Sequence, residues 1–264
     1  MKTVIVTGGT FGIGAGITVG LARAGWRVVA FGLESAQVSS IARDGIQQVR
    51  AELEREGLQA DLLEADVSRA EDVARVVRHT LDRHGRIDGL VNNAAIGPLG
   101  TVLDTDEALW DSIMAVNLKG VYLCARQVIP HMARQGGGAI VNVGSGAGWG
   151  KPNMAAYSAS KGGLVALSAA MAYDHFHQHI RVNLLIPGGG GIVSGMSLGR
   201  MGADAAKFGR NAVGSAAGRP VVPADMAAAA AFLLSDEAAA ISGTVLDVGC
   251  FANQGGPVPP RPQA

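Results

Sequence analysis

The sequence predicts an α/β fold: a doubly wound parallel sheet of about seven strands, with helices on both faces. Three observations predict it. Short β-branched apolar runs alternate with longer helical patterns along the 264 residues. The runs are apolar throughout instead of alternating, as expected for strands that are buried on both faces. A glycine-rich turn, TGGTFGIG at 7–14, follows the first run and opens the first helical pattern. In such sheets ligands bind at the carboxyl ends of the strands.

The elements follow one another in a regular order. We expect strands at 3–8, 27–32, 60–67, 89–95, 138–145, 180–188 and 243–249, and helices near 13–24, 36–56, 70–84, 106–134, 156–177 and 224–234. Neither a linker nor a repeat divides the chain, so we expect a single domain over 1–254, with a substrate loop at about 188–220. The proline-rich end, 255–264, is expected to be an extended or disordered tail.

Composition excludes several classes of protein. The formal net charge is zero, so neither nucleic acid nor an anionic membrane is an expected partner. Cys124 and Cys250 lie far apart in apolar contexts, which favours reduced thiols over a disulfide. The first residues, MKTVIVTGG, are typical of a strand and not of a signal peptide, and no run of eighteen apolar residues occurs. We therefore expect a cytoplasmic protein.

The glycine turn favours a nucleotide ligand. Gly8, Gly12 and Gly14 would let the backbone turn tightly and let a pyrophosphate reach the helix N-terminus. Similar turns occur in methyltransferases and in unrelated proteins. The position directly after the first strand favours a dinucleotide.

The end of the second strand usually decides between the two nicotinamide cofactors. A carboxylate there binds the ribose hydroxyls of NAD, and an arginine accommodates the 2′-phosphate of NADP. Here Gly32 and Leu33 occupy these places, and Glu34 would repel a phosphate if it pointed inward. Phe11 and Ala15 stand where the turn could carry a basic residue. The pattern favours NAD over NADP.

Tyr157 and Lys161 lie one helical turn apart in AAYSASKGG, with small residues around them. This spacing is common on helices and by itself has a structural explanation. Ser145 alone could form a turn, and Asn117 alone could bend its helix. His175, His177 and His179 alternate, but alternate residues converge only on a strand and this run ends a helical pattern, so we expect no metal site.

Several motifs occur together in a characteristic order. They are TGGTFGIG, NNAA at 92–95, VNLKG around Asn117, GS at 144–145, YSASK at 157–161 and IPG at 186–188. Together, over about residues 3–250, they resemble the short-chain dehydrogenase/reductase family of the Tyr-x-x-x-Lys type. The resemblance implies a Rossmann-like fold and NAD(P)-dependent hydride transfer between a secondary alcohol and a ketone.

The resemblance also implies a role for each catalytic residue. Tyr157 would be the general acid/base, and Lys161 would lower the pKa of its phenol and hold the nicotinamide ribose. Ser145 would bond the substrate oxygen, and Asn117 would complete a proton relay through water. The small residues around Tyr157 and Lys161 would let cofactor and substrate approach the helix closely.

The implied cofactor site is extensive. It comprises Gly8, Thr10, Phe11, Gly12, Ile13, Gly14, Gly32, Leu33, Asp66, Val67, Asn93, Ala94, Ala95, Tyr157, Lys161, Pro187, Gly188 and Ser194. Ala95 replaces the usual glycine of the family, and Ser194 replaces the usual threonine after additional glycines.

The implied substrate contacts are mostly apolar. They are Ser145, Trp149, Met154, Tyr157 and Met196. They favour a hydrophobic or aromatic alcohol or ketone. Lys207, Arg200 and Arg210 leave an anionic substituent open.

Two further expectations concern assembly and activity. The helices near 106–134 and 156–177 would form a homotetramer interface, with a dimer as the alternative. A non-catalytic NAD(P)-binding redox regulator on the same fold is the alternative function. Such regulators commonly lack the tyrosine or the lysine, and this chain retains both.

Overall fold

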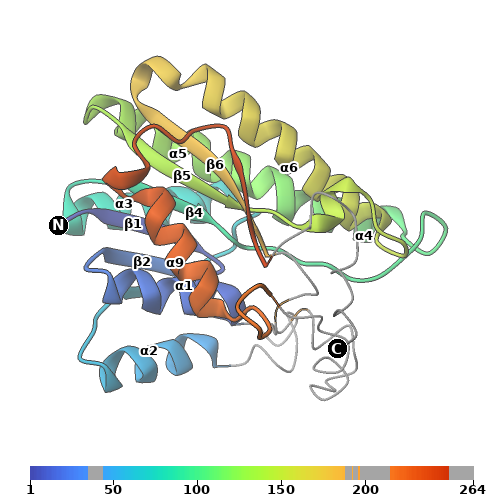
Figure 1. Cartoon of the computed structure of the whole chain (residues 1–264), viewed down its shortest axis with the longest axis horizontal. Helices are drawn as coiled ribbons and strands as arrows, with labels where there is room; N and C mark the ends of the chain where they lie inside the picture. The colour runs from blue at the N-terminus through green and yellow to red at the C-terminus, as the bar shows by residue number, and fades with distance from the viewer. Residues whose placement is uncertain (35–43, 188–191, 193–195, 197–214, 250–264) are drawn as a thin grey trace, which may run out of the picture.

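The computed structural model describes residues 1–34, 44–187, 192, 196 and 215–249 (Figure 1). Its sheet has seven strands in the order β3-β2-β1-β4-β5-β6-β7, and every neighbouring pair is parallel. The strands are β1 Thr3–Thr7, β2 Arg27–Gly32, β3 Asp61–Glu64, β4 Gly89–Asn92, β5 Gly138–Val143, β6 Ile180–Pro187 and β7 Val245–Val248. The predicted doubly wound parallel sheet is confirmed. Strand order reverses between β1 and β4, where such sheets bind ligands.

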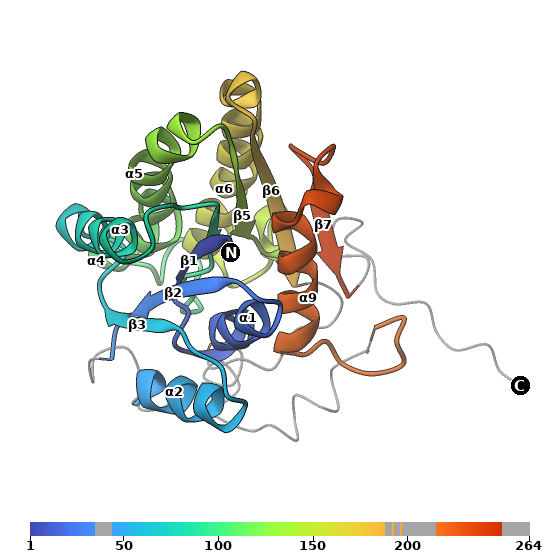
Figure 2. The same cartoon turned by 90° about the vertical axis from the view of Figure 1, so that its left-hand side faces the viewer.

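Helices cover both faces of this sheet (Figure 2). The helices α1 Gly12–Arg23, α2 Gly45–Arg55 and α9 Pro223–Leu234 pack on one face. The helices α3 Ala70–His84, α5 Gly120–Arg134 and α6 Ala155–Asp174 pack on the other. Because both faces are covered, β1 and β4 are buried at every residue, which explains their continuous apolar runs.

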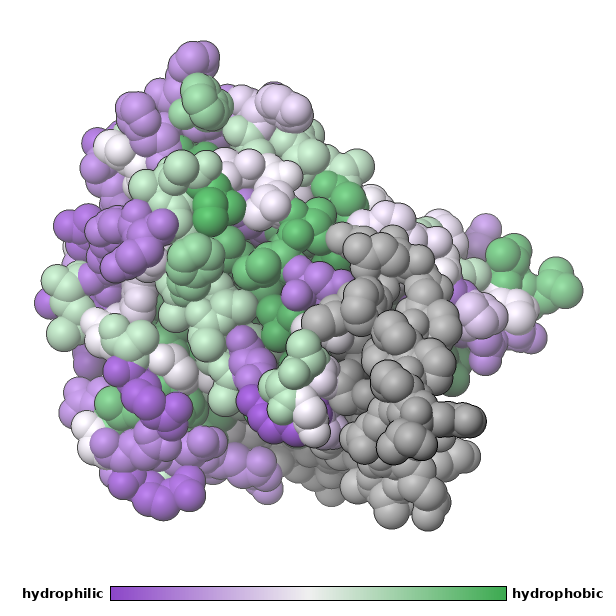
Figure 3. Space-filling model, viewed as in Figure 1, coloured by the Kyte–Doolittle hydropathy of each residue, from purple (hydrophilic) through white to green (hydrophobic). Residues whose placement is uncertain are grey.

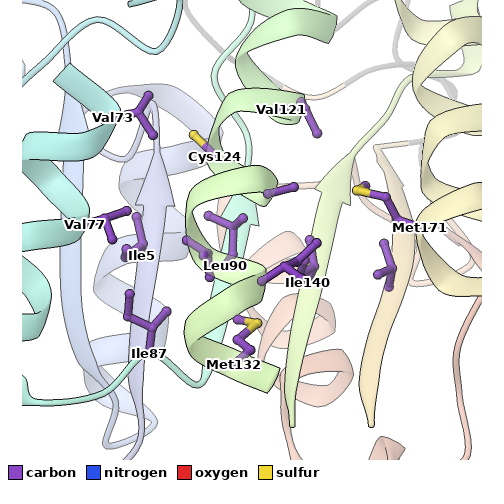
Figure 4. Packing of buried hydrophobic residues seen from close by; sticks show 14 of the residues in the cluster. Ile5, Val73, Val77, Ile87, Leu90, Val121, Cys124, Met132, Ile140 and Met171 are labelled. Atoms are coloured by element: carbon purple, nitrogen blue, oxygen red, sulfur yellow. The ribbon is translucent and has the colours of Figure 1, made fainter. Parts of the chain in front are cut away.

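The core beneath α3, α5 and α6 is built from branched aliphatic side chains. Figure 4 shows Ile5, Leu90 and Ile140 from three adjacent strands pointing toward the helices, where Val73 and Met171 meet them. Each fully buried side chain of this size contributes about 1.5–3 kcal/mol. This packing anchors the strands whose carboxyl ends carry the described site residues.

Several element boundaries differ from expectation. The predicted helix at 106–134 is interrupted: α4 Glu107–Met114 passes into a π-helical turn η1, Ala115–Lys119, before α5 begins. Strand β3 ends at Glu64, and β4 ends at Asn92 because the next residue bonds to Thr7 instead of extending the sheet.

Other predicted segments fall partly or wholly outside the described residues. The first part of the predicted helix at 36–56 lies there, and α2 begins at Gly45. Most of the predicted loop at 188–220 and the whole tail at 255–264 lie there too. Across the part of the chain that is described, none of the helices has the length and apolar character needed to cross a membrane.

Candidate active site

The glycine turn connects β1 to α1 and has room only for glycine at its centre. Gly8 and Gly12 have φ of +61° and +56°, in the left-handed region that favours glycine. A Cβ on Gly14 would lie 1.9 Å from the Gly8 carbonyl oxygen. At the N-terminus of α1, Phe11 makes no side-chain capping bond, and Ile13 follows in the first turn. A side-chain-free cradle at an uncapped helix N-terminus suits a pyrophosphate, so these residues fit a dinucleotide.

The residues after β4 are fastened to this turn. The Asn93 side-chain amide donates to the carbonyl oxygens of Thr7 and Gly8, each at 3.1 Å. The Thr7 hydroxyl accepts from the backbone N–H groups of Asn93 and Ala94, each at 3.0 Å. The structure thus brings the predicted Asn93 and Ala94 against Gly8, and half-buried Ala95 continues the same segment.

The end of β2 is the most open part of the predicted cofactor site. Gly32 lies against Thr10, because a Cβ on Gly32 would meet the Thr10 hydroxyl at 2.5 Å. The Leu33 side chain is 37% exposed. The Glu34 carboxylate accepts a hydrogen bond from the backbone N–H of Ile46 in the first turn of α2. This bond keeps a negative charge close to the end of β2.

Asp66 and Val67 follow β3. The Asp66 carboxylate accepts from the backbone N–H and the hydroxyl of Ser68, at 2.8 and 2.7 Å. Val67 is buried and packs against Gly120 at the start of α5. Asp66 therefore shapes its own turn at the carboxyl edge of the sheet, where the adenine contact was predicted.

Tyr157 and Lys161 are both buried in α6, with exposed fractions of 6% and 3%. The Lys161 Nζ donates to the Val143 carbonyl oxygen at 2.8 Å and lies 5.9 Å from the centre of the Tyr157 ring. Burial lowers the pKa of Lys161 to about 8, because the ammonium loses water that would solvate its charge. A titratable cation beside a phenol is an arrangement suited to proton transfer at the phenol oxygen.

Ser145 lies two residues beyond Val143, the residue that holds Lys161. It begins a short 3₁₀ turn, η2 Gly146–Trp149, and its hydroxyl accepts from the Ala147 N–H at 3.2 Å. The turn packs on α6 backbone to backbone: a Cβ on Gly148 would lie 3.1 Å from the Lys161 carbonyl oxygen. Part of the small-residue pattern in α6 therefore serves this packing, in addition to the predicted approach of ligands.

Asn117 is buried within the π-helical turn, and its side chain makes three hydrogen bonds. Its Oδ1 accepts from the Ile96 N–H at 2.9 Å, and its Nδ2 donates to the Ile96 carbonyl at 2.8 Å and to the Ser160 hydroxyl at 3.0 Å. Both Nδ2 hydrogens are thus engaged, whereas Oδ1 keeps a second lone pair that could accept from a relay water. Sequence reasoning missed Ser160, although its position three residues after Tyr157 places it on the same helix face.

Two of the predicted substrate residues, Trp149 and Met154, lie just before the start of α6. Trp149 is 47% exposed at the end of η2, and half-buried Met154 pairs with Gly100 in an isolated bridge before α6. Met196 is half-buried, and Pro187 ends β6. Gly188, Ser194, Arg200, Lys207 and Arg210 lie outside the described residues.

Two further expectations from the sequence concern the cysteines and the histidine run at 175–179. Cys124 is a buried free thiol, and Cys250 lies outside the described residues. His175 pairs with Gln178 through Nδ1 at 2.6 Å, and His177 packs edge-on against Phe176. Within the described ranges, no cluster of three or more metal-ligating side chains occurs.

The family model for short chain dehydrogenases matches residues 2–197. A 2-(S)-hydroxypropyl-CoM dehydrogenase 3 of Xanthobacter autotrophicus is 36% identical over 252 residues, which cover 94% of each chain. An inactive 2-(S)-hydroxypropyl-CoM dehydrogenase 2 of the same organism is 39% identical over 218 residues, covering 81% of this chain and 93% of the relative.

Solved structures agree with these relatives. Levodione reductase superposes with a TM-score of 0.82 at 31% identity, covering 94% of this chain and 96% of the other. A putative NAD(P)-dependent gluconate 5-dehydrogenase from Beutenbergia cavernae, with NADP bound at low occupancy, gives 0.79 at 33% identity, covering 93% and 94%. The range matched by the family model includes the glycine turn and the Tyr157–Lys161 helix. The chain therefore belongs to the short-chain dehydrogenase family, whose members are oxidoreductases that bind NAD(P).

Proposed function

We propose that this protein is a secondary alcohol dehydrogenase or ketoreductase with Tyr157 as the general acid/base. The observation that carries this proposal is the buried Lys161 ammonium, held by the Val143 carbonyl with its nitrogen 5.9 Å from the Tyr157 ring centre. Few structural roles need a cation in that position, because burying an ammonium is costly without a function for the charge.

The proposed chemistry divides between the cofactor and the chain. NAD(P), which the glycine turn at Gly8, Gly12 and Gly14 would hold, would supply the acceptor and donor of the hydride. Tyr157 Oη takes the hydroxyl proton in oxidation and gives a proton to the carbonyl oxygen in reduction. An unperturbed phenol has a pKa of about 10, and a nearby ammonium favours its ionised form. Ser145 donates a hydrogen bond to the substrate oxygen and stabilises its negative charge as hydride moves.

We propose NAD as the preferred cofactor. Support comes from Glu34, whose carboxylate is fixed at the start of α2 beside the end of β2. A 2′-phosphate placed there would meet this negative charge. Neither positions 32 and 33 nor the glycine turn carries an arginine or a lysine.

We propose a hydrophobic or aromatic alcohol or ketone as the substrate. Leu99 and Trp149 are exposed apolar side chains: Leu99 precedes Gly100, which pairs with Met154 before α6, and Trp149 ends the η2 turn that leads to α6. They would lie at the opening above Ser145, where an apolar substrate group could cover them.

The test begins with fluorescence titration of the protein with NADH and NADPH, followed by a screen of secondary alcohols such as 1-phenylethanol and 2-octanol. Tyr157→Phe should lower kcat by about 10³-fold or more, since the proton would have no acceptor. Tyr173→Phe is the matched control: it changes a tyrosine of the same helix that is 84% exposed. Equal turnover by both variants would refute the assignment of Tyr157.

A non-catalytic cofactor-binding role is the second candidate. The observation favouring it is that a relative 39% identical to this chain bears the name of an inactive dehydrogenase. Tight NAD(H) binding with no turnover of any alcohol or ketone, in wild type and variants alike, would select this role.

We propose a homotetramer, with a dimer as the alternative. Trp110 and Tyr122 are exposed on α4 and α5, and Tyr122 lines a hollow of about 650 Å³. The hollow is lined by Asp111, Met114, Ala115, Leu118, Lys119, Tyr122, Gly163 and Leu167. Apolar residues also gather on the loop between β4 and α4, which projects from the molecule at the right of Figure 3. Light scattering tests the assembly: Tyr122→Asp should shift it toward smaller species, and a monomeric wild type would refute it.

A further inference from the structure

Two buried serines of α6, Ser160 and Ser168, make the same pair of hydrogen bonds. The Ser168 hydroxyl donates to the Leu164 carbonyl at 2.6 Å and accepts from the Asn142 amide at 2.8 Å. The Ser160 hydroxyl donates to the Tyr157 carbonyl at 2.8 Å and accepts from the Asn117 amide at 3.0 Å. Both serines are at least nine-tenths buried. Each serine therefore bonds to the backbone of its own helix and to an asparagine of a neighbouring element.

The two serines differ in what they connect. Ser168 joins α6 to β5 two turns beyond Lys161. Ser160 instead holds the carbonyl of Tyr157 itself and immediately precedes Lys161. Through Asn117 it is also joined to both backbone groups of Ile96, in the segment that follows the glycine-turn contacts of Asn93 and Ala94. A continuous chain of hydrogen bonds thus runs from that segment to the helical turn that carries the phenol and the ammonium.

We propose that Ser160 is a positioning residue for the reaction, which fixes the Tyr157–Lys161 turn relative to Asn117 and the Ile96 segment. The inference rests on the proposed function only in taking Tyr157 as the group that transfers the proton. Ser160 does not touch the reacting atoms in this role. It acts by holding the backbone from which both reacting side chains extend.

Loss of the Ser160 hydroxyl would loosen the helical turn that carries Tyr157 and Lys161. The Asn117 Nδ2 would lose its Ser160 acceptor, and the Tyr157 carbonyl would lose a donor. Lys161 would remain held by Val143, so the phenol would gain freedom relative to a fixed ammonium. While Lys161 is protonated, a greater average separation weakens the attraction that favours the phenolate, and so raises the pKa of the phenol.

The experiment compares Ser160→Ala with Ser168→Ala as a matched control. The phenol of Tyr157 is titrated in the cofactor-free protein from tyrosinate absorbance, with Tyr157→Phe subtracted to remove the other two tyrosines. Ser160→Ala should raise this pKa by about 0.5 unit or more and lower kcat for 1-phenylethanol about tenfold. Both alanine variants should lower Tm by similar amounts. Ser168→Ala should leave the phenol pKa unchanged and kcat within twofold of wild type.

Equal phenol pKa and kcat in the two alanine variants would overturn the inference, because a merely structural serine lowers Tm without moving either value. If Ser160→Ala does not fold, Ser160→Cys replaces it, since a thiol keeps the shape but is only a weak hydrogen-bonding group. It should raise the same phenol pKa, and an unchanged value would overturn the inference. Full turnover by Tyr157→Phe would refute the proposed function instead, and the absorbance titration would still decide the role of Ser160.

Discussion

The carboxyl ends of β5 and β2 are built in opposite ways. Beyond β5, Lys161 and Tyr157 are buried, and Val143 fixes the ammonium by a hydrogen bond across 18 residues of chain. At the end of β2, Leu33 is partly exposed and the carboxylate of Glu34 accepts from the backbone N–H of Ile46. The difference indicates that the proposed proton chemistry depends on a buried network, whereas cofactor choice depends on a few replaceable side chains.

The largest expected effect is at the β5 end. Lys161→Met should lower kcat by about 10²-fold or more, because it removes the charge that favours the phenolate. Steady-state rates with the alcohol found in the screen measure this. Unchanged kcat would remove Lys161 from the proposed mechanism. It would also show that the proton chemistry does not depend on the buried network beyond β5.

The same variant has a pH signature in stability. The pKa of Lys161 is lowered to about 8 in the folded protein, so above that pH the unfolded chain binds the additional proton. Wild-type stability should therefore gain on the order of 2 kcal/mol from this group between about pH 7 and about pH 9.5. Urea denaturation at both pH values should show this gain reduced in Lys161→Met. An equal gain in both proteins would contradict the lowered pKa.

A substitution in the glycine turn tests whether this turn binds the pyrophosphate of the cofactor. Gly14→Ala should weaken NADH binding by about 100-fold, because its Cβ would collide with the Gly8 carbonyl at 1.9 Å. Gly57→Ala is the control: its φ is +67° but no atom lies within 4 Å of the added carbon. It should cost about 1 kcal/mol of stability and leave NADH binding unchanged. Fluorescence titration measures the affinities, and equal binding by both variants would exclude the turn as the pyrophosphate site.

A moderate effect is expected at the β2 end. Leu33→Arg should shift the ratio of kcat/KM values by about tenfold toward NADP, because a guanidinium would offset the nearby Glu34 carboxylate and bind the 2′-phosphate. Leu33→Gln, which adds no charge, should leave the ratio within twofold. A ratio that does not respond to arginine would show that the end of β2 does not select the cofactor.

The smallest expected effect concerns the reactivity of Cys124, a buried thiol in the core. Burial raises the pKa of Cys124 to about 12, so at about pH 8 its thiol should react with a disulfide reagent only when the protein opens. Reaction of a Cys250→Ser variant, followed by absorbance, should proceed at the rate of unfolding. Rapid reaction in the folded state would show that the reagent reaches Cys124 without unfolding, and that the core around it is not closed.

The sequence by itself determined the parallel sheet, the glycine turn and the pairing of Tyr157 with Lys161. All three follow from local pattern, because strand burial, turn glycines and helical spacing are set by residues close together in the chain. Tertiary structure alone decided the π-helical turn at Asn117, the hold of Val143 on Lys161 and the bond between Asn117 and Ser160. The last of these joins residues 43 positions apart. Such bonds depend on how helices dock on the sheet, and no local periodicity encodes that docking.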